Sequence, residues 1–251
     1  MLVVGLLVGL GLCALHPTGP SRGPFAFGHD RNLPNLPSDD AAAQTGPGAI
    51  GHAGAVTDRA SRPGGILLTG GASRRMGFDK TMLLIDGVPC AERIGRLLAG
   101  VLDVVVEVGP GRSSLPAVRE EPPGMGPLAA VVAGYQWINR TSPLTLGAVV
   151  VAGDLPMLSE AVLNMLADWP GEDSVVPVVA GRAQTLLARW SAEALRRAEA
   201  LVERGTRSML PLLEGGGIRF VEEAQWPKGV EASAFGDVDT VEDLERLGLQ
   251  P

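Results

Sequence analysis

The stretch ILLTGGASRRMGFDK, residues 66–80, starts as a short apolar run and ends in glycine and positive charge. Residues 66–69 have the composition of a buried strand. Gly70 and Gly71 follow directly, and without Cβ atoms they allow a sharp turn and a close approach of backbone N–H groups to an anion. The stretch therefore predicts a strand that ends in a phosphate-binding loop.

Three cations follow the glycine pair, namely Arg74, Arg75 and Lys80. Arginine can bind a phosphate group through two parallel hydrogen bonds, whereas lysine acts as a point charge. The loop is not a P-loop, because Asp79 rather than glycine precedes the lysine, and its glycines lack the G-x-G-x-x-G spacing of dinucleotide-binding folds. A glycine-rich turn beside a solvated basic surface is the alternative, but the position after a strand in a net-acidic chain favours phosphate binding.

Composition excludes several classes of function. The chain has 251 residues, of which 45% are hydrophobic, so it can bury a sizeable core. Its net charge of -7 argues against a general affinity for nucleic acid, and no nucleic-acid partner is expected. Cys13 and Cys90 lie far apart and indicate neither a disulfide framework nor a zinc site. His16, His29 and His52 all precede residue 64, so catalysis by a Ser-His-Asp triad is not expected.

The first 63 residues differ from the remainder of the chain. Residues 1–15 are continuously apolar, but they are shorter than the roughly 20 residues that span a bilayer, and no basic segment precedes them. Residues 16–63 are rich in Pro, Gly, Ala and Asp and have neither a helical nor a strand period. We interpret 1–63 as an extension with a disordered linker and 64–251 as the folded domain, without a membrane partner. A secretory signal or anchor is the alternative for the apolar segment.

Apolar β-rich runs and helix-like stretches alternate from residue 64 onward. The predicted strands are 66–69, 104–108, 148–152 and 175–179, and the predicted helices are 89–99, 127–137, 159–168 and 191–204. Strands that are apolar on both faces and separated by helices predict a three-layer α/β/α domain around a mostly parallel sheet. Ligands of such sheets bind beyond the carboxyl ends of the strands.

A carboxylate is predicted at this edge of the sheet. GAVVVAGDLP, residues 147–156, is a buried strand that ends in Asp154. Carboxylate oxygens suit Mg²⁺, which often shares its coordination with substrate phosphates. Capping of the next helix is the alternative role, although Ser159 is the better N-cap candidate.

Two further motifs carry potential ligands. In GDVDTVEDL, residues 236–244, Asp237 and Asp239 would face the same side of a strand. Solvated acids next to a capped final helix are the alternative. PGMGPLAA, residues 123–130, is a glycine-rich turn that enters a helix, with Pro127 suited to the first helical position. Its backbone N–H groups could contact a nucleotide, and an ordinary loop before a helix is the alternative.

Four motifs in order resemble the molybdenum cofactor guanylyltransferases, nucleotidyltransferases with a Rossmann-like, glycosyltransferase-A-like fold. They are LTGGASRRMGFDK (68–80), EEPPGMGPLAA (120–130), VVVAGDLPML (149–158) and FGDVDTVEDL (235–244). The resemblance covers residues 64 to about 249. It implies a cytoplasmic, Mg²⁺-dependent enzyme that transfers GMP from GTP to the phosphate of molybdopterin and releases pyrophosphate. Other proteins of the cofactor pathway would contact it only transiently.

The resemblance also assigns roles to residues. It implies catalytic roles for Lys80, Arg75 and Asp154, and metal binding by Asp154 and Asp239, the latter standing where the family usually has Asn. The nucleotide-binding residues that it implies are Leu68, Thr69, Gly70, Gly71, Arg75, Lys80, Glu120, Gly126, Pro127 and Leu128.

Three of these positions depart from the family pattern. Thr69 replaces Ala, Ala130 replaces Gly and Glu120 replaces Asp. In the family these motifs contact the nucleotide and go with guanine, so the departures concern the choice of base. Transfer from CTP, transfer to a different phosphorylated acceptor, and a non-catalytic nucleotide-binding module are the alternative functions.

The second half of the chain is predicted to bind the acceptor. VVPVVAGRAQTLLARW, residues 175–190, reads as two strands joined by a turn that carries Arg182. By resemblance this half receives the molybdopterin phosphate, so Arg182 and Arg207 are the candidate acceptor-binding residues. Solvated surface arginines are the alternative.

Overall fold

The computed structural model describes residues 62–70, 79–143 and 145–238. These residues lie within one compact unit, Ala55–Pro251. All four predicted strands are present, as β1 (Gly64–Leu68), β4 (Val105–Val108), β6 (Gly147–Ala152) and β7 (Ser174–Val179). All four predicted helices are also present, as α1 (Cys90–Val101), α2 (Pro127–Thr141), α3 (Glu160–Asp168) and α4 (Ala192–Glu203). Most of the predicted extension, 1–61, is outside the described residues, so the domain boundary stays a prediction.

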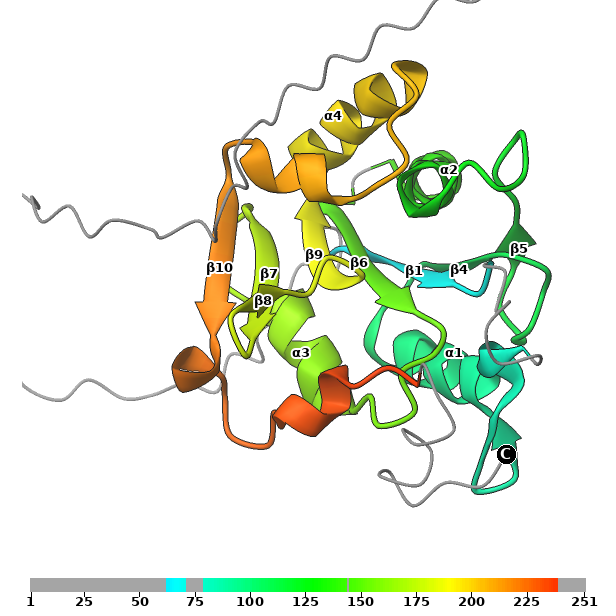
Figure 1. The fold of residues 1–251 in the computed structure, drawn as a ribbon, viewed down its shortest axis with the longest axis vertical. Helices are drawn as coiled ribbons and strands as arrows, with labels where there is room; N and C mark the ends of the chain where they lie inside the picture. The colour runs from blue at the N-terminus through cyan, green and yellow to red at the C-terminus, as the bar shows by residue number, and fades with distance from the viewer. Residues whose placement is uncertain (1–61, 71–78, 144, 239–251) are drawn as a thin grey trace, which may run out of the picture. The chain divides into compact units, whose positions relative to one another are not determined.

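The central sheet is mostly parallel, as predicted, and its strand order is β10-β7-β9-β6-β1-β4-β5 (Figure 1). β1 pairs in parallel with both β4 and β6, and β5 (Ala117–Val118) extends the sheet beyond β4. β9 (Leu187–Ser191) is antiparallel to β6 and β7 and separates them. β10 (Ile218–Glu222) runs parallel to β7, and the short β8 (Arg182–Ala183) pairs with β7 in the connection to β9.

Helices cover both faces of the sheet, which confirms the three-layer prediction. α1 and α3 lie on one face, and α2 and α4 lie on the other (Figure 1). Side chains alternate along β1: Leu67 packs in the core under α1 and α3, whereas Ile66 and Leu68 pack in the core under α2 and α4. Full burial of such an aliphatic side chain contributes about 1.5–3 kcal/mol. The two apolar layers therefore hold β1 rigidly at the centre of the sheet.

The helix starts differ in how they are capped. Ser191 caps α4, since its side chain accepts a hydrogen bond from the Ala194 N–H. Ser159 occupies the N-cap position of α3, as expected, but it makes no capping hydrogen bond. Its buried Oγ has no hydrogen-bond partner among the described residues, so the predicted N-cap position is confirmed without a capping hydrogen bond from the side chain. Pro127 is at the start of α2, after Gly126, as the sequence predicted.

Several short elements were not predicted. β2 (Leu84–Ile85) and β3 (Val88–Pro89) form a separate hairpin. Its turn residues, Asp86 and Gly87, have φ angles of 51° and 77°, as in the two-residue turns that suit Asp-Gly. The 3-10 helices are η2 (Lys80–Met82), η3 (Leu210–Glu214), η4 (Glu223–Gln225) and η5 (Ala232–Phe235). None of the helices that the structure describes is long and apolar enough to cross a membrane.

Candidate active site

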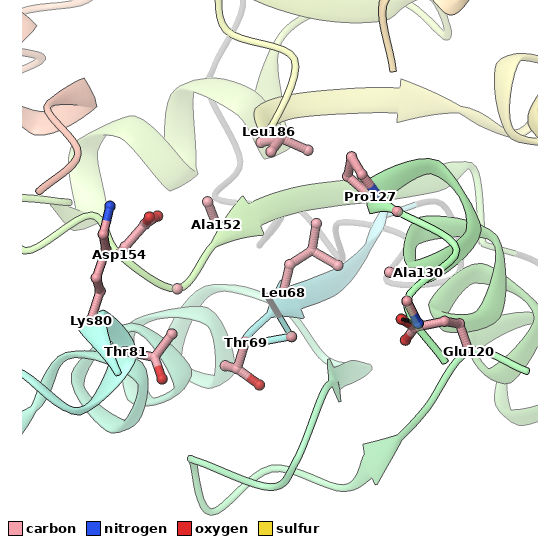
Figure 2. Close-up of a pocket in the computed structure, with 14 residues that line it drawn as sticks. Leu68, Thr69, Lys80, Thr81, Glu120, Pro127, Ala130, Ala152, Asp154 and Leu186 are labelled. Atoms are coloured by element: carbon pink, nitrogen blue, oxygen red, sulfur yellow. Dashed lines mark hydrogen bonds between the residues drawn. The ribbon is translucent and has the colours of Figure 1, made fainter. Parts of the chain in front are cut away.

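A pocket of about 490 Å³ opens beyond the carboxyl ends of β1 and β6. We call it the first pocket (Figure 2). Leu68 and Thr69 line it from the end of β1, and Ala152 and Asp154 line it from the end of β6. The Gly153 N–H donates to the Leu68 carbonyl over 2.8 Å, which keeps the two strand ends together. The pocket therefore lies at the edge of the sheet where the sequence predicted a ligand.

The two ends of the first pocket differ in chemistry. Figure 2 shows Lys80 and Asp154 at one end, and Glu120, Pro127 and Ala130 at the other. A flexible ammonium and a carboxylate at the first end suit phosphates and a cation. The second end is formed by the start of α2 and the loop before it, where backbone groups and small side chains leave room for a planar group.

Lys80 is oriented by the residue before it. The Asp79 side chain caps η2, accepting from the Thr81 N–H over 3.1 Å and from the Thr81 hydroxyl over 2.6 Å. Its second oxygen forms an ion pair with Arg112 at 3.0 Å. Lys80 and Thr81 both line the first pocket from this capped turn.

The start of α2 is supported by Arg207. The Leu128 N–H donates to the Arg207 carbonyl over 3.1 Å, so one orphan donor of the first helical turn is satisfied. Gly126 has a φ angle of 94°, and a Cβ there would overlap with the Arg207 backbone and Cβ. Arg207, a predicted acceptor residue, therefore lies behind the end of the first pocket that the start of α2 forms.

A buried glutamate, Glu107 on β4, supports Thr69 and was not predicted. Its exposed fraction is 0%, and one carboxylate oxygen accepts from the Thr69 hydroxyl over 2.5 Å. Burial raises the pKa of Glu107, but hydrogen bonds from Thr69 and Ser113 and from the Arg112 and Ser113 amides outweigh it, so the net pKa is lowered. The one signal in the sequence is a lone acid inside the apolar run 104–108.

A second pocket of about 420 Å³ adjoins the first. The two pockets share Ala152, Asp154 and Leu186. Arg182 lines the second pocket together with polar residues of the turn before β9, whereas Arg207 is not among the described residues that line it. The structure thus separates the two predicted acceptor residues, with one beside each pocket.

Asp154 is where the two pockets meet. It is half-buried and lines both. Its carbonyl accepts from the Val238 N–H over 3.3 Å, which brings the C-terminal motif to the site, and Asp237 lines the second pocket. The predicted ligand Asp239 lies outside the described residues, as do Gly71, Arg74 and Arg75 of the predicted loop.

The donor set suits a hard cation. Asp154 and Asp237 both line the second pocket, and carboxylate oxygens are the ligand type that Mg²⁺ prefers. Within residues 62–70, 79–143 and 145–238, no group of three or more His, Cys, Asp or Glu side chains could hold a metal by itself. Mg²⁺ commonly takes one or two carboxylates and completes its coordination with water and substrate phosphates, so two carboxylates fit.

Known proteins resemble this chain in sequence and in fold. Residues 65–215 match the family described as a MobA-like NTP transferase domain. The chain belongs to this family. The resemblance seen in the four motifs is thereby confirmed, and the MobA-like domain is a nucleotidyltransferase by family.

Two relatives of the MobA-like domain have similar names. The chain is 31% identical to the molybdenum cofactor guanylyltransferase of Rhodobacter capsulatus, over 74% of this chain and 94% of the relative. It is 39% identical to the probable molybdenum cofactor guanylyltransferase of Chloroflexus aggregans, over 56% of this chain and 72% of the relative.

Solved structures show the same fold. Molybdopterin-guanine dinucleotide biosynthesis protein A from Archaeoglobus fulgidus superposes with a TM-score of 0.60 at 24% identity, over 73% of this chain and 95% of that chain. A nucleotidyl transferase from Methanothermobacter has a TM-score of 0.58 at 19% identity, over 74% and 95% of the two chains. The mostly parallel sheet with helices on both faces agrees with these neighbours.

Proposed function

We propose that the chain transfers GMP from GTP to the phosphate of molybdopterin and releases pyrophosphate. The observation that carries this proposal is the first pocket, with Lys80 and Asp154 at one end and the start of α2 at the other. The name of the Rhodobacter capsulatus relative supports the choice of substrates. Because the reaction consumes GTP, we assign it to the cytoplasm.

The nucleotide is oriented by the difference between the two pocket ends. Its triphosphate lies towards Gly70 and Lys80, and the sequence predicts Gly71 and Arg75 as further donors. Its base lies towards the start of α2, between Leu68 and Pro127, where Gly126, Leu128 and Glu120 complete the predicted binding set.

The reaction is an in-line displacement at the α-phosphorus of GTP. A phosphate oxygen of the acceptor forms the new P–O bond, and the bond between the α-phosphorus and the bridging oxygen to the β-phosphorus breaks. The acceptor phosphate is already ionised, so the chain needs no general base, and Lys80 stabilises the charge of the leaving pyrophosphate. Asp154 would hold Mg²⁺ together with a carboxylate of the C-terminal motif, Asp237 or the predicted ligand Asp239. The bound ion would supply positive charge to the phosphate oxygens.

The acceptor occupies the second pocket, because that pocket meets the first at Asp154. Arg182 binds the acceptor phosphate or its polar ring edge, and Gln184 and Thr185 lie in the same wall. The phosphorus that is attacked then lies at the junction of the two pockets. This arrangement holds both reactants close together, which removes much of the entropic barrier to a bimolecular reaction.

The test uses the full-length chain with molybdopterin, Mg²⁺ and each of GTP, CTP, ATP and UTP. We expect pyrophosphate release and a guanine dinucleotide product, detected by mass spectrometry, with GTP alone. Asp154→Ala and Lys80→Ala should each lower kcat/KM by about 100-fold or more, as removal of a transition-state charge contact does. Arg197→Met, on the outside of α4, is the control for loss of a surface cation.

The other outcomes separate the alternatives. Thr69 and Ala130 both line the first pocket and both depart from the guanine-binding pattern, so transfer from CTP is the second candidate. A cytosine dinucleotide product would select it. The chain could instead bind a nucleotide but release no pyrophosphate, whether molybdopterin or another phosphorylated acceptor is present. That outcome would select a non-catalytic nucleotide-binding module.

A further inference from the structure

One loop contacts both segments that flank the glycine- and arginine-rich stretch 71–78. This loop, residues 109–115, follows β4 and is called the β4 loop below. The upstream segment is Thr69 and Gly70, at the end of β1. The downstream segment is Asp79 and Lys80, at the start of η2. Both segments line the first pocket, through Thr69, Gly70 and Lys80.

Glu107 holds the β4 loop in shape. Its carboxylate accepts from the Gly111 N–H over 2.8 Å, from the Arg112 N–H over 2.7 and 2.9 Å, and from the Ser113 N–H and hydroxyl over 2.8 and 2.7 Å. The same carboxylate accepts from the Thr69 hydroxyl. A fully buried carboxylate with this many donors is stabilised in its charged form. One side chain therefore fixes both the β4 loop and the residue that ends β1.

The backbone adds a second connection to the upstream segment. The Thr69 and Gly70 N–H groups both donate to the Val108 carbonyl, over 3.1 and 3.3 Å. Gly109 follows, and any Cβ there would overlap with the Thr69 hydroxyl and the Gly70 nitrogen. The β4 loop thus packs directly against the upstream segment.

Arg112 connects the β4 loop to the downstream segment. Its guanidinium forms the 3.0 Å ion pair with Asp79, and the two side chains have exposed fractions of 39% and 32%. Asp79 caps the turn that carries Lys80. Neither Glu107 nor Arg112 is among the described residues that line the first pocket, so any effect on a nucleotide passes through the residues that they hold.

We propose that Glu107 and Arg112 are positioning residues that hold the upstream and downstream segments in place, so that Gly70 and Lys80 face the nucleotide together. This inference rests on the proposed function, because it assigns the first pocket to a nucleoside triphosphate. The Arg112–Asp79 pair can be removed at an exposed position, which makes it the best place for a test.

The experiment measures GTP affinity by calorimetry, and Tm, for the full-length chain. The variants are Arg112→Met, Asp79→Asn, which retains a capping side chain, and the double variant, with Arg197→Met as the matched control. Each single variant should weaken GTP binding about twofold to fivefold, the size of a partly exposed ion pair. The double variant should bind GTP no more weakly than the weaker-binding of the two single variants, because both substitutions remove the same interaction. Arg112→Met and Arg197→Met should leave Tm nearly unchanged.

A purely structural role gives a different result. Unchanged GTP affinity in Arg112→Met, or single effects that add in the double variant, would overturn the proposal. If the wild-type chain binds no GTP, the proposed function fails, and hydrogen exchange without nucleotide then decides the positioning role. Arg112→Met should accelerate exchange of the Met82 and Leu83 amides, which donate to the Asp79 and Lys80 carbonyls, while unchanged exchange would overturn it.

Discussion

Thr69 connects the end of a strand to a carboxylate that has no contact with solvent. Its hydroxyl donates to Glu107, which also accepts from the β4 loop. Loss of a donor to a buried charge typically costs about 1.5–3 kcal/mol. The identity of residue 69 is therefore a matter of stability as well as of the lining of the first pocket.

Glu107 should make stability depend on pH. Its pKa is lowered in the folded state, so its contribution is fully present above the ordinary glutamate pKa of about 4.3 and is lost as the pH falls through the lowered value. The difference in the free energy of unfolding between wild type and Glu107→Gln should therefore shrink from neutral pH towards about pH 3. Urea unfolding across this range measures it.

Glu203→Gln, an exposed glutamate at the end of α4, controls for loss of one carboxylate. A constant difference between wild type and Glu107→Gln at every pH would contradict the hydrogen-bonded, charged state of Glu107.

Cys90 should be inert in the folded protein. Burial, together with the negative charge of Asp154, raises the pKa of its thiol to about 12, although Arg93 opposes this shift. At about pH 8 only about one thiol in 10,000 is then ionised, and the thiolate is the reactive form. In a Cys13→Ser background, we expect negligible reaction with Ellman's reagent when folded and full reaction in urea. Rapid reaction of the folded protein would contradict this.

Individual residues were predictable only where position in a pattern defines their role. Asp154 was predicted because it directly follows a buried strand. Glu107 was not, because its donors come from Thr69 on another strand and from a loop that bends back towards it. A period of two says which face a strand residue occupies, but it does not say which polar groups meet there.

At the scale of elements, the turn before α2 is restricted both by positive φ angles and by crowding from a neighbouring residue. Gly124 and Gly126 have φ angles of 81° and 94°, which L-residues with a Cβ rarely adopt. Only Gly126 is also crowded, by Arg207, whereas a Cβ at Gly124 would meet open space. The two glycines therefore form a matched pair for separating backbone strain from packing.

Gly124→Ala and Gly126→Ala should both destabilise the protein, each by about 1–3 kcal/mol from the strained φ angle. Gly126→Ala should lose more, because its new Cβ overlaps with Arg207 and pushes it away from the Leu128 N–H. Urea unfolding of the two variants measures the difference. Equal losses would show that contact with Arg207 does not restrict this turn.

The long elements were predictable and the short ones were not. β1 and β6 are buried on both faces and read as continuous apolar runs. β10 was missed because it lies at the sheet edge, and only Val221 of its residues is fully buried. The β2–β3 hairpin was missed because two-residue strands carry no readable period.

At the scale of the molecule, the proposed function assigns the two substrates to the two adjoining pockets. Arg182 lines the second pocket, and Arg207 supports the start of α2 beside the first. Both were predicted as acceptor residues, because a sequence alone does not show which pocket each arginine lies beside. The KM values for GTP and for the acceptor can distinguish the roles of Arg182 and Arg207.

Arg182→Ala should raise the KM for the acceptor about tenfold or more, the effect of losing a charged hydrogen bond of roughly 1.5–3 kcal/mol. The KM for GTP should change little. Arg207→Ala should change neither KM much, because alanine keeps the carbonyl that binds the Leu128 N–H and the Cβ that lies beside Gly126. Steady-state kinetics with either substrate varied provides the measurement, and an acceptor-specific effect of Arg207→Ala would contradict this division.

The reversed direction of β9 has a consequence for how such enzymes diversify. The turn between β7 and β9, residues 180–186, contains β8, which pairs with β7. This turn lines the second pocket through Arg182, Gln184 and Thr185. Insertions or deletions in that turn need not alter the register of β6 against β1. A change in that turn would therefore alter what the second pocket can bind and leave the strands that carry the first pocket in place.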